Sequence, residues 1–173
     1  MRHLTIGVLV LLAACGRGDS TAPASVVGYY RLASVHGQPL PFEFPADSLL
    51  ASPDTGVFIT TWREEILNLR PDGRAEDGLQ ISLRSRYSGD PAYSEASWLD
   101  FYTGRWTMTG NGVRAVFDSI AEGGGPMTLL AAPLTLTFER SGSGTLVSHY
   151  PYRHSSLGTP PPVVDYQLVY RKE

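Results

Sequence analysis

The sequence predicts an all-β fold of about eight antiparallel strands, closed as a barrel or, alternatively, stacked as a β-sandwich. Three observations predict it. The 18 glycines and 13 prolines among 173 residues leave few windows long enough for three turns of helix. Val, Ile, Leu, Thr and aromatic residues recur in short alternating runs, and turn motifs separate these runs at the spacing of antiparallel sandwiches and barrels.

The first strand is expected over residues 27–36. There Tyr30, Leu32 and Ser34 fall on one face, and the intervening side chains fall on the other. Two prolines in the segment 36–41 fix φ and remove backbone donors, which predicts a turn. Residues 42–56 are rich in Pro, Asp and Ser and are expected to be irregular.

The next strand should run to Leu69, with an interruption or bulge around 62–65. Arg70-Pro71-Asp72-Gly73 has Pro at the second and Gly at the fourth position, which suits a type I turn. A strand follows over 74–86, with Leu79, Ile81 and Leu83 on one face.

The second half of the chain continues the pattern. Residues 97–109 form one long strand, or two strands kinked at Gly104, and Gly110-Asn111-Gly112 turns the chain into a strand over 113–118. A Gly-rich loop over 119–130 precedes a hairpin of strands 133–139 and 145–150 around the turn 141–144. After residues 151–162, the final strand starts at Val164.

The N-terminus has the pattern of a secretory signal. Arg2 and His3 precede an apolar run over 4–14 that is too short to span a membrane and ends at Leu12-Ala13-Ala14-Cys15. These last four residues resemble the lipobox of bacterial lipoproteins, which implies cleavage before Cys15 and acylation of its thiol. Cys15 is the single cysteine, so it can form no disulfide within the chain. We therefore expect a signal peptide at 1–14, a lipidated tether at 15–26 and one β-barrel domain at 27–173.

The processed chain is expected in the cell envelope, anchored through the acyl chains on Cys15. Position 16 is Gly, not the Asp associated with inner-membrane retention, which favours the outer membrane over the inner. Cleavage removes one arginine and leaves 13 basic against 17 acidic residues, a net charge of −4. The basic residues are scattered, so we expect no nucleic-acid partner.

The two ends of the β domain resemble a lipocalin-like (calycin) barrel. Gly28-Tyr29-Tyr30 resembles the Gly-x-Trp that opens the first strand of that family, with Tyr in place of Trp. Tyr170-Arg171 resembles its last-strand Arg. The resemblance implies that the first and last strands pair and that Gly28, Tyr30 and Arg171 close the barrel, with the guanidinium against an aromatic ring.

No motif indicates catalysis, a cofactor or a metal site. The histidines of the processed chain, His36, His149 and His154, lack the even spacing that would place two ligands on one face of a strand, and are expected in water. Glu64 and Glu65 point to opposite faces of a strand. The sequence contains no nucleophile elbow, phosphate loop or dinucleotide fingerprint, so an enzyme is not expected.

An aromatic cluster is the strongest indication of function. We expect Trp98, Tyr102 and Trp106 to bind a small hydrophobic ligand in the barrel. Asp100 lies on the face of Trp98 and Tyr102, which would make it a buried acid if that face lines the lumen, but we favour the arrangement in which Leu99 and Phe101 face the core and Asp100 is solvated. The alternative function is an envelope interaction module, in which a filled barrel binds another protein through its surface or through loops 42–56 and 151–162.

Overall fold

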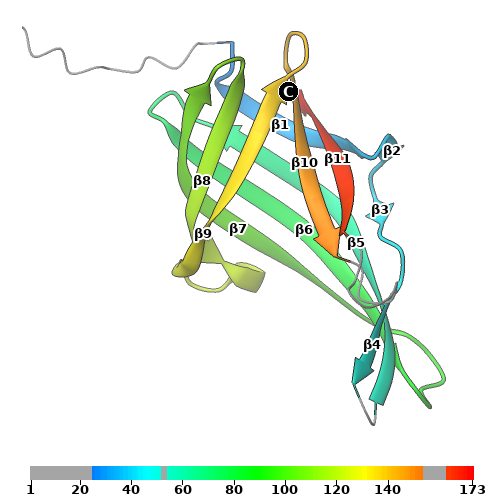
Figure 1. Cartoon of the computed structure of the whole chain (residues 1–173). Helices are drawn as coiled ribbons and strands as arrows, with labels where there is room; N and C mark the ends of the chain where they lie inside the picture. The colour runs from blue at the N-terminus through cyan, green and yellow to red at the C-terminus, as the bar shows by residue number, and fades with distance from the viewer. Residues whose placement is uncertain (1–24, 52–53, 154–162) are drawn as a thin grey trace, which may run out of the picture.

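Eight antiparallel strands form a closed barrel in the computed structural model, which describes residues 25–51, 54–153 and 163–173 (Figure 1). The barrel strands are β1 (Gly28–Val35), β5 (Asp54–Leu69), β6 (Arg74–Tyr87), β7 (Ser94–Thr109), β8 (Gly112–Ala121), β9 (Thr128–Arg140), β10 (Thr145–Arg153) and β11 (Val163–Lys172). From β5 to β11, each strand pairs with the next one in the chain. The predicted all-β barrel is confirmed, and the sandwich alternative is wrong.

The barrel closes at β1, which pairs with β11 on one side and with β5 on the other. Tyr30 lies opposite Lys172 across the first seam and opposite Leu67 across the second. The first and last strands therefore pair, as the lipocalin-like resemblance implies. Closure leaves no edge along most of the sheet, which removes the open hydrogen-bonding groups that make edge strands prone to association.

Three short strands precede β5: β2 (Gln38–Pro39), β3 (Phe42–Glu43) and β4 (Asp47–Ala51). The first lies in the segment 36–41, where we expected a turn, and the other two lie in the segment 42–56, which we expected to be irregular. β3 pairs with the edge of β5 beyond the point where the pairing of β1 with β5 ends, placing Phe42 opposite Trp62. The backbone N–H of Phe44 then donates to Thr60 O at 2.9 Å. β3 thus extends the barrel wall and directs Phe44 into the interior.

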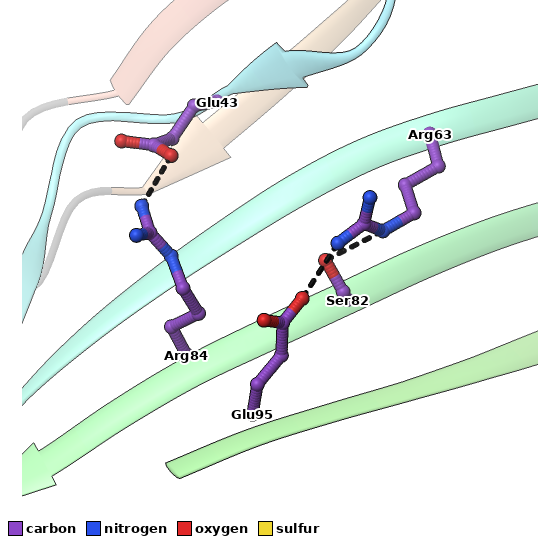
Figure 2. Close-up of polar contacts among 5 residues, drawn as sticks. All are labelled: Glu43, Arg63, Ser82, Arg84 and Glu95. Carbon is purple, nitrogen blue, oxygen red and sulfur yellow. Dashed lines mark hydrogen bonds and ion pairs between the residues drawn. The ribbon is translucent and has the colours of Figure 1, made fainter. Parts of the chain in front are cut away.

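Ion pairs link side chains across strands on the outer wall (Figure 2). Arg84 of β6 donates to Glu43 at 2.5 Å, which ties β3 to the sheet across β5. Arg63 of β5 donates to Glu95 of β7 at 2.6 Å and to Ser82 Oγ at 3.0 Å. Ser82 is buried beneath these side chains although it lies on the outer face.

The predicted turns all occur. Gly73 N donates to Arg70 O at 3.1 Å and has a φ of +80°, which glycine adopts without steric cost. The hairpin turn before β8 centres on Gly110-Asn111, one residue earlier than Asn111-Gly112, because Thr109 pairs with Gly112. The predicted irregularity of β5 is a bulge between Trp62 and Glu64.

Bulges also decide which side chains face inward. The alternation of Tyr30 and Leu32 on the inner face holds, but a bulge between Leu32 and Ser34 turns the buried Val35 inward in place of Ser34. Strand β7 remains continuous through Gly104, with a bulge between Thr103 and Gly104 in its pairing with β8.

One half of the barrel interior is filled by side chains. This filled half contains the ends of the strands nearest Gly28 and is packed by Tyr30, Leu32, Leu67, Leu69, Ala75, Trp106, Val113, Ala115, Phe117, Phe138, Leu146 and Tyr170. All are at most 4 % exposed. It provides the apolar burial that stabilises a domain without disulfides, and leaves the other half of the interior as the place for a site.

Candidate ligand-binding site

A cavity of about 290 Å³ lies inside the barrel, beyond the filled half. Its volume is at the lower end of the range of small-molecule sites. The cavity is lined by Phe44, Thr60, Trp62, Glu65, Asp77, Leu79, Ile81, Asp100, Tyr102, Leu134, Leu136, Tyr150, Tyr152, Leu168 and Tyr170. The lining is mainly aromatic and aliphatic, with three carboxyl groups among it.

The three carboxyl groups come from adjacent strands. Glu65 of β5 pairs with Leu79 of β6, which in turn pairs with Asp100 of β7. Asp77 lies two residues before Leu79, so it is the diagonal neighbour of both other acids on the inner face. We call Glu65, Asp77 and Asp100 the acidic cluster. All three side chains are buried.

Glu65 is 4 % exposed, and one of its oxygens has a partner. The Tyr170 hydroxyl donates to Glu65 Oε1 at 2.6 Å. Burial raises the pKa of Glu65 to about 7, and the hydrogen bond from Tyr170 opposes part of this rise. At neutral pH the protonated and ionised forms of Glu65 are therefore similar in free energy, so a small change in the surroundings shifts the balance between them.

Asp77 is 3 % exposed. Burial and, secondarily, the charge of Glu65 raise its pKa well above the usual range of an aspartate. Among the described residues, Asp77 Oδ1 and Glu65 Oε2 have no hydrogen-bond partner. A buried unpaired oxygen costs about 1–3 kcal/mol, so the two acids hold unsatisfied binding capacity beside the cavity.

Asp100 completes the cluster, with its Oδ1 accepting a hydrogen bond from the backbone N–H of Gly123 at 3.4 Å. Tyr102 stands two residues further along the same face. Burial, followed by the charges of Asp100 and Asp77, raises the pKa of Tyr102 to about 12. Tyr102 therefore remains a neutral hydrogen-bond donor at physiological pH.

An aromatic wall faces the acidic cluster. The Phe44 ring lies 5.2 Å from Trp62 and 4.8 Å from Tyr152, centroid to centroid. Trp62 and Tyr150 are 5.1 Å apart. The Tyr152 hydroxyl donates to Asp47 Oδ2 at 2.6 Å, and burial together with this bond raises the pKa of Tyr152 to about 12. These contacts fix the rings in place, so this part of the cavity is preorganised.

No Lys, Arg or His is among the described residues that line the cavity. His36 and His149 are exposed, and His149 Nδ1 lies 2.8 Å from Asp165 on the outer face of β10 and β11. His154 lies outside the described residues. Within the described ranges, no group of three or more His, Cys, Asp or Glu side chains could hold a metal ion.

Of the three residues predicted to bind a ligand, Tyr102 alone lines the cavity. Trp106 shares its face of β7 but is packed into the filled half, where its Nε1 donates to Arg70 O at 2.9 Å. Trp98 lies near the start of β7, opposite Ile81, and is not among the lining residues. The ligand-site prediction required this face of β7 to line the lumen, whereas the arrangement favoured from the sequence turned Leu99 and Phe101 inward. The depth at which the barrel is hollow was not predicted.

The predicted closure residues lie at the seam, with one change of role. Gly28 pairs with Leu69, and the buried Tyr30 hydroxyl donates to Val26 O at 2.8 Å. Arg171 is exposed because the alternation of β11 points it outward. The cation over the Tyr30 ring is Lys172, with its Nζ 6.0 Å from the centroid, instead of the expected Arg171.

The preference for a solvated Asp100 was wrong. Leu99 is 50 % exposed and Phe101 is 37 % exposed on the outer face, so Asp100 points into the barrel.

Glu64 and Glu65 do face opposite sides of β5, but Glu65 was not predicted as a site residue. The sequence signal for Asp77 that was missed is its place in the strand alternation. Asp77 lies on the same face as Leu79, Ile81 and Leu83, which the sequence assigns to the interior.

A second hollow lies on the outer wall. This outer groove, of about 450 Å³, is lined by Tyr29, Glu64, Ile66, Asn68, Glu76, Gly78, Gln80, Leu99 and Phe101. Gly78 lacks a side chain between the exposed Leu99 and Phe101 on β7 and the polar Glu64 on β5. The groove is larger than the interior cavity, but it is open to water along the sheet surface.

The predicted lipid attachment at Cys15 and the signal peptide 1–14 lie outside the described residues. Within the described part of the chain, no helix is long and apolar enough to cross a membrane.

Comparison with protein-family models, with curated proteins and with solved structures finds no match to this chain.

Proposed function

We propose that this protein is a lipid-anchored envelope protein that binds a small ligand with an apolar body inside its barrel. The observation that supports it most strongly is the 290 Å³ cavity bounded by preordered aromatic rings within a closed sheet. A well-formed apolar pocket with a few convergent polar groups is the usual form of a small-molecule site. The lipobox at 12–15 supports the anchored location.

The first test uses ligand-dependent tryptophan fluorescence of the full chain, purified in a non-ionic detergent. Trp62 lines the cavity, whereas Trp98 and Trp106 do not. We expect naphthalene-sized aromatic compounds to change the emission of the wild-type chain in a saturable way. Trp62→Phe should remove this change and Trp98→Phe should keep it. An emission that stays constant across such a panel, or that responds equally in both variants, would contradict binding in the cavity.

A second candidate function is binding of another envelope protein through the outer groove. The specific observation in its favour is the exposure of Tyr29, Leu99 and Phe101 beside one another on the outer wall, since apolar residues grouped on a surface often mark an interface. A photo-crosslinking residue at position 99 should give an adduct of one discrete mass in the expressing cell. The same residue at Arg114, which is exposed on β8, should give none.

A further inference from the structure

The acidic cluster specifies the chemistry of the ligand more closely than the size of the cavity does. Resting on the proposed function, we infer that the cavity binds a monovalent organic cation: an ammonium group on a compact aromatic or apolar body. The ammonium lies against Glu65 and Asp77, and the apolar body lies among Phe44, Trp62 and Tyr150.

The first argument is charge. A buried carboxylate requires either a proton or a cationic partner, and no cationic side chain is among the described residues of the cavity lining. Tyr170 satisfies Glu65 Oε1, whereas Glu65 Oε2 and Asp77 Oδ1 have no partner in the described part of the chain. In the free protein a proton neutralises these acids, and a cationic partner for their ionised forms would have to come from a ligand.

The second argument is geometry. Glu65 and Asp77 are diagonal neighbours on adjoining strands, a relation that places backbones about 7–8 Å apart and side chains within reach of one bridging group. An ammonium carries three donors and no acceptor. It can donate to two acceptor oxygens at once and also balances their negative charge, which a neutral donor does not.

The third argument is the aromatic lining. Six cavity residues carry aromatic rings: Phe44, Trp62, Tyr102, Tyr150, Tyr152 and Tyr170. Ring faces attract cations, most strongly when water is excluded. The hydroxyls of Tyr102 and Tyr152 stay neutral because burial and nearby carboxyl groups raise their pKa values to about 12. The wall therefore adds favourable interactions for a cation and no opposing charge.

Binding of a cation should release a proton. The free cavity stabilises neutral carboxyl groups, and a bound ammonium stabilises their ionised forms. The titratable groups that line the cavity with Glu65 are Asp77 from β6, Asp100 and Tyr102 from β7, Tyr150 and Tyr152 from β10, and Tyr170 from β11. With the pKa of Glu65 at about 7 and that of Asp77 raised well above its usual value, the affinity for the ammonium should rise as pH increases through neutrality.

The test is isothermal titration calorimetry with three compounds that share one ring system: 1-naphthylmethylammonium, 1-naphthalenemethanol and 1-naphthoate. The full chain is titrated in one non-ionic detergent throughout. We expect the ammonium to bind about tenfold tighter than the alcohol or better, and the carboxylate to bind weakest. Titration in phosphate and in Tris should show proton release for the ammonium and none for the alcohol.

The chain offers a matched control for the acids. Glu65→Gln with Asp77→Asn removes two buried carboxyl groups and keeps their shapes. Glu64→Gln with Glu76→Gln removes two carboxyl groups at positions one residue away on the same strands, both facing outward along the outer groove. The inner pair should abolish the preference for the ammonium while the alcohol still binds. The outer pair should leave all three affinities unchanged.

The outcomes separate this inference from the proposed function. If the alcohol binds as tightly as the ammonium, or if the inner pair leaves the preference intact, the cation inference is wrong and the ligand cavity remains. If none of the three compounds binds, the proposed function fails as well. If the outer pair alone reduces binding, the ligand occupies the outer groove and both statements about the cavity are wrong.

Discussion

At the scale of single residues, Glu65 is the side chain that most distinguishes this barrel from one filled only by apolar groups. It is buried in the wall of the cavity, and one of its oxygens accepts a hydrogen bond from the Tyr170 hydroxyl. Burial without a counter-charge destabilises the ionised form. An apolar side chain at this position would avoid that loss of free energy, so the fold itself does not need a glutamate here. A residue that reduces stability at the edge of a cavity is typical of a functional site.

The raised pKa of Glu65 makes stability depend on pH in a defined direction. Its pKa is about 7 in the folded protein and about 4.5 without burial. The folded state therefore binds the proton more tightly, and this contribution to stability is fully present below about pH 4.5 and lost as pH rises through 7. We expect urea denaturation of wild type to show a decrease of roughly 3 kcal/mol in the free energy of unfolding across this window relative to Glu65→Gln. Parallel pH profiles of the two proteins would contradict the assignment.

Tyr170→Phe tests the partner of Glu65. The change removes the donor to Glu65 Oε1 and leaves a second buried oxygen unpaired. We expect a loss of about 1–3 kcal/mol in the free energy of unfolding, and a further rise in the pKa of Glu65 in carboxyl carbon NMR titrations. Tyr29→Phe, on the exposed outer face, should change stability by less than about 0.5 kcal/mol. Equal effects of the two changes would argue against the buried bond.

At this scale alternation identified the inner face of one strand and not of another. Along β6 it grouped Leu79, Ile81 and Leu83, and it would have added Asp77 had the run been extended by one more step. Along β7 the favoured arrangement turned Leu99 and Phe101 inward, which is wrong. Glu65 follows a bulge between Trp62 and Glu64, which shifts the register by one residue. Its inward direction therefore depends on strand pairing, which local pattern does not determine.

At the scale of the strands, Gly104 is a position where two strands approach too closely for a side chain. A Cβ at Gly104 would lie 2.0 Å from Val116 O and 2.6 Å from Phe117 Cα, beside the register shift between β7 and β8. We expect Gly104→Ala to destabilise the barrel by about 1–3 kcal/mol or more, because the contacting atoms are backbone. Gly78→Ala is the control, since its Cβ would meet only the Phe101 ring at 3.7 Å. Thermal unfolding followed by circular dichroism compares the two, and a Gly104→Ala protein as stable as Gly78→Ala would contradict the close packing.

The strand β3 presents adjacent residues with opposite roles. Phe44, just after it, is 2 % exposed inside the barrel, whereas Glu43 pairs with Arg84 on the outside (Figure 2). We expect Phe44→Ala to reduce the free energy of unfolding by about 3–5 kcal/mol, and Glu43→Gln by less than about 1 kcal/mol. Denaturant unfolding measures both. A larger effect from Glu43→Gln would mean that the ion pair, not the aromatic wall, holds β3 in place.

The long strands and their turns were predicted because each combines two signals, alternation and turn chemistry. The run before Leu69 and the turn at 70–73 agree with one another, as do the hairpin turn at 141–144 and its flanking strands. The short strands β2, β3 and β4 were missed because their pairing comes from the edges of β1 and β5 and not from their own composition. Pro, Asp and Ser are poor strand formers, and tertiary pairing overrides that preference.

At the scale of the whole molecule, the barrel is divided into a filled half that stabilises it and a hollow half that carries the acidic cluster. The lipocalin-like resemblance implied the closing of the first strand on the last, and the structure has that pairing. The sequence offered no means of locating the boundary between the two halves, because packing volume is a sum over side chains from all eight strands.

The proposed lipid anchor also belongs to this scale. Cys15→Ser should prevent acylation and move the protein from the detergent-extracted membrane fraction to the soluble fraction. Mass spectrometry of the wild-type N-terminus should show a chain that begins at Cys15 and carries acyl chains. We expect at least two acyl chains, because a single chain gives only marginal membrane binding. An unmodified thiol at Cys15, or wild type and Cys15→Ser in the same fraction, would contradict the anchor.

The most direct test of the central claim, a cation-binding cavity inside the barrel, is a crystal structure of the full chain soaked with 4-bromobenzylammonium. The anomalous signal of bromine locates the ligand independently of the fitted coordinates. We expect one peak among Phe44, Trp62 and Tyr150, with the ammonium against Glu65 and Asp77. A peak confined to the outer groove beside Leu99, or no peak inside the barrel at a saturating concentration, would contradict the account.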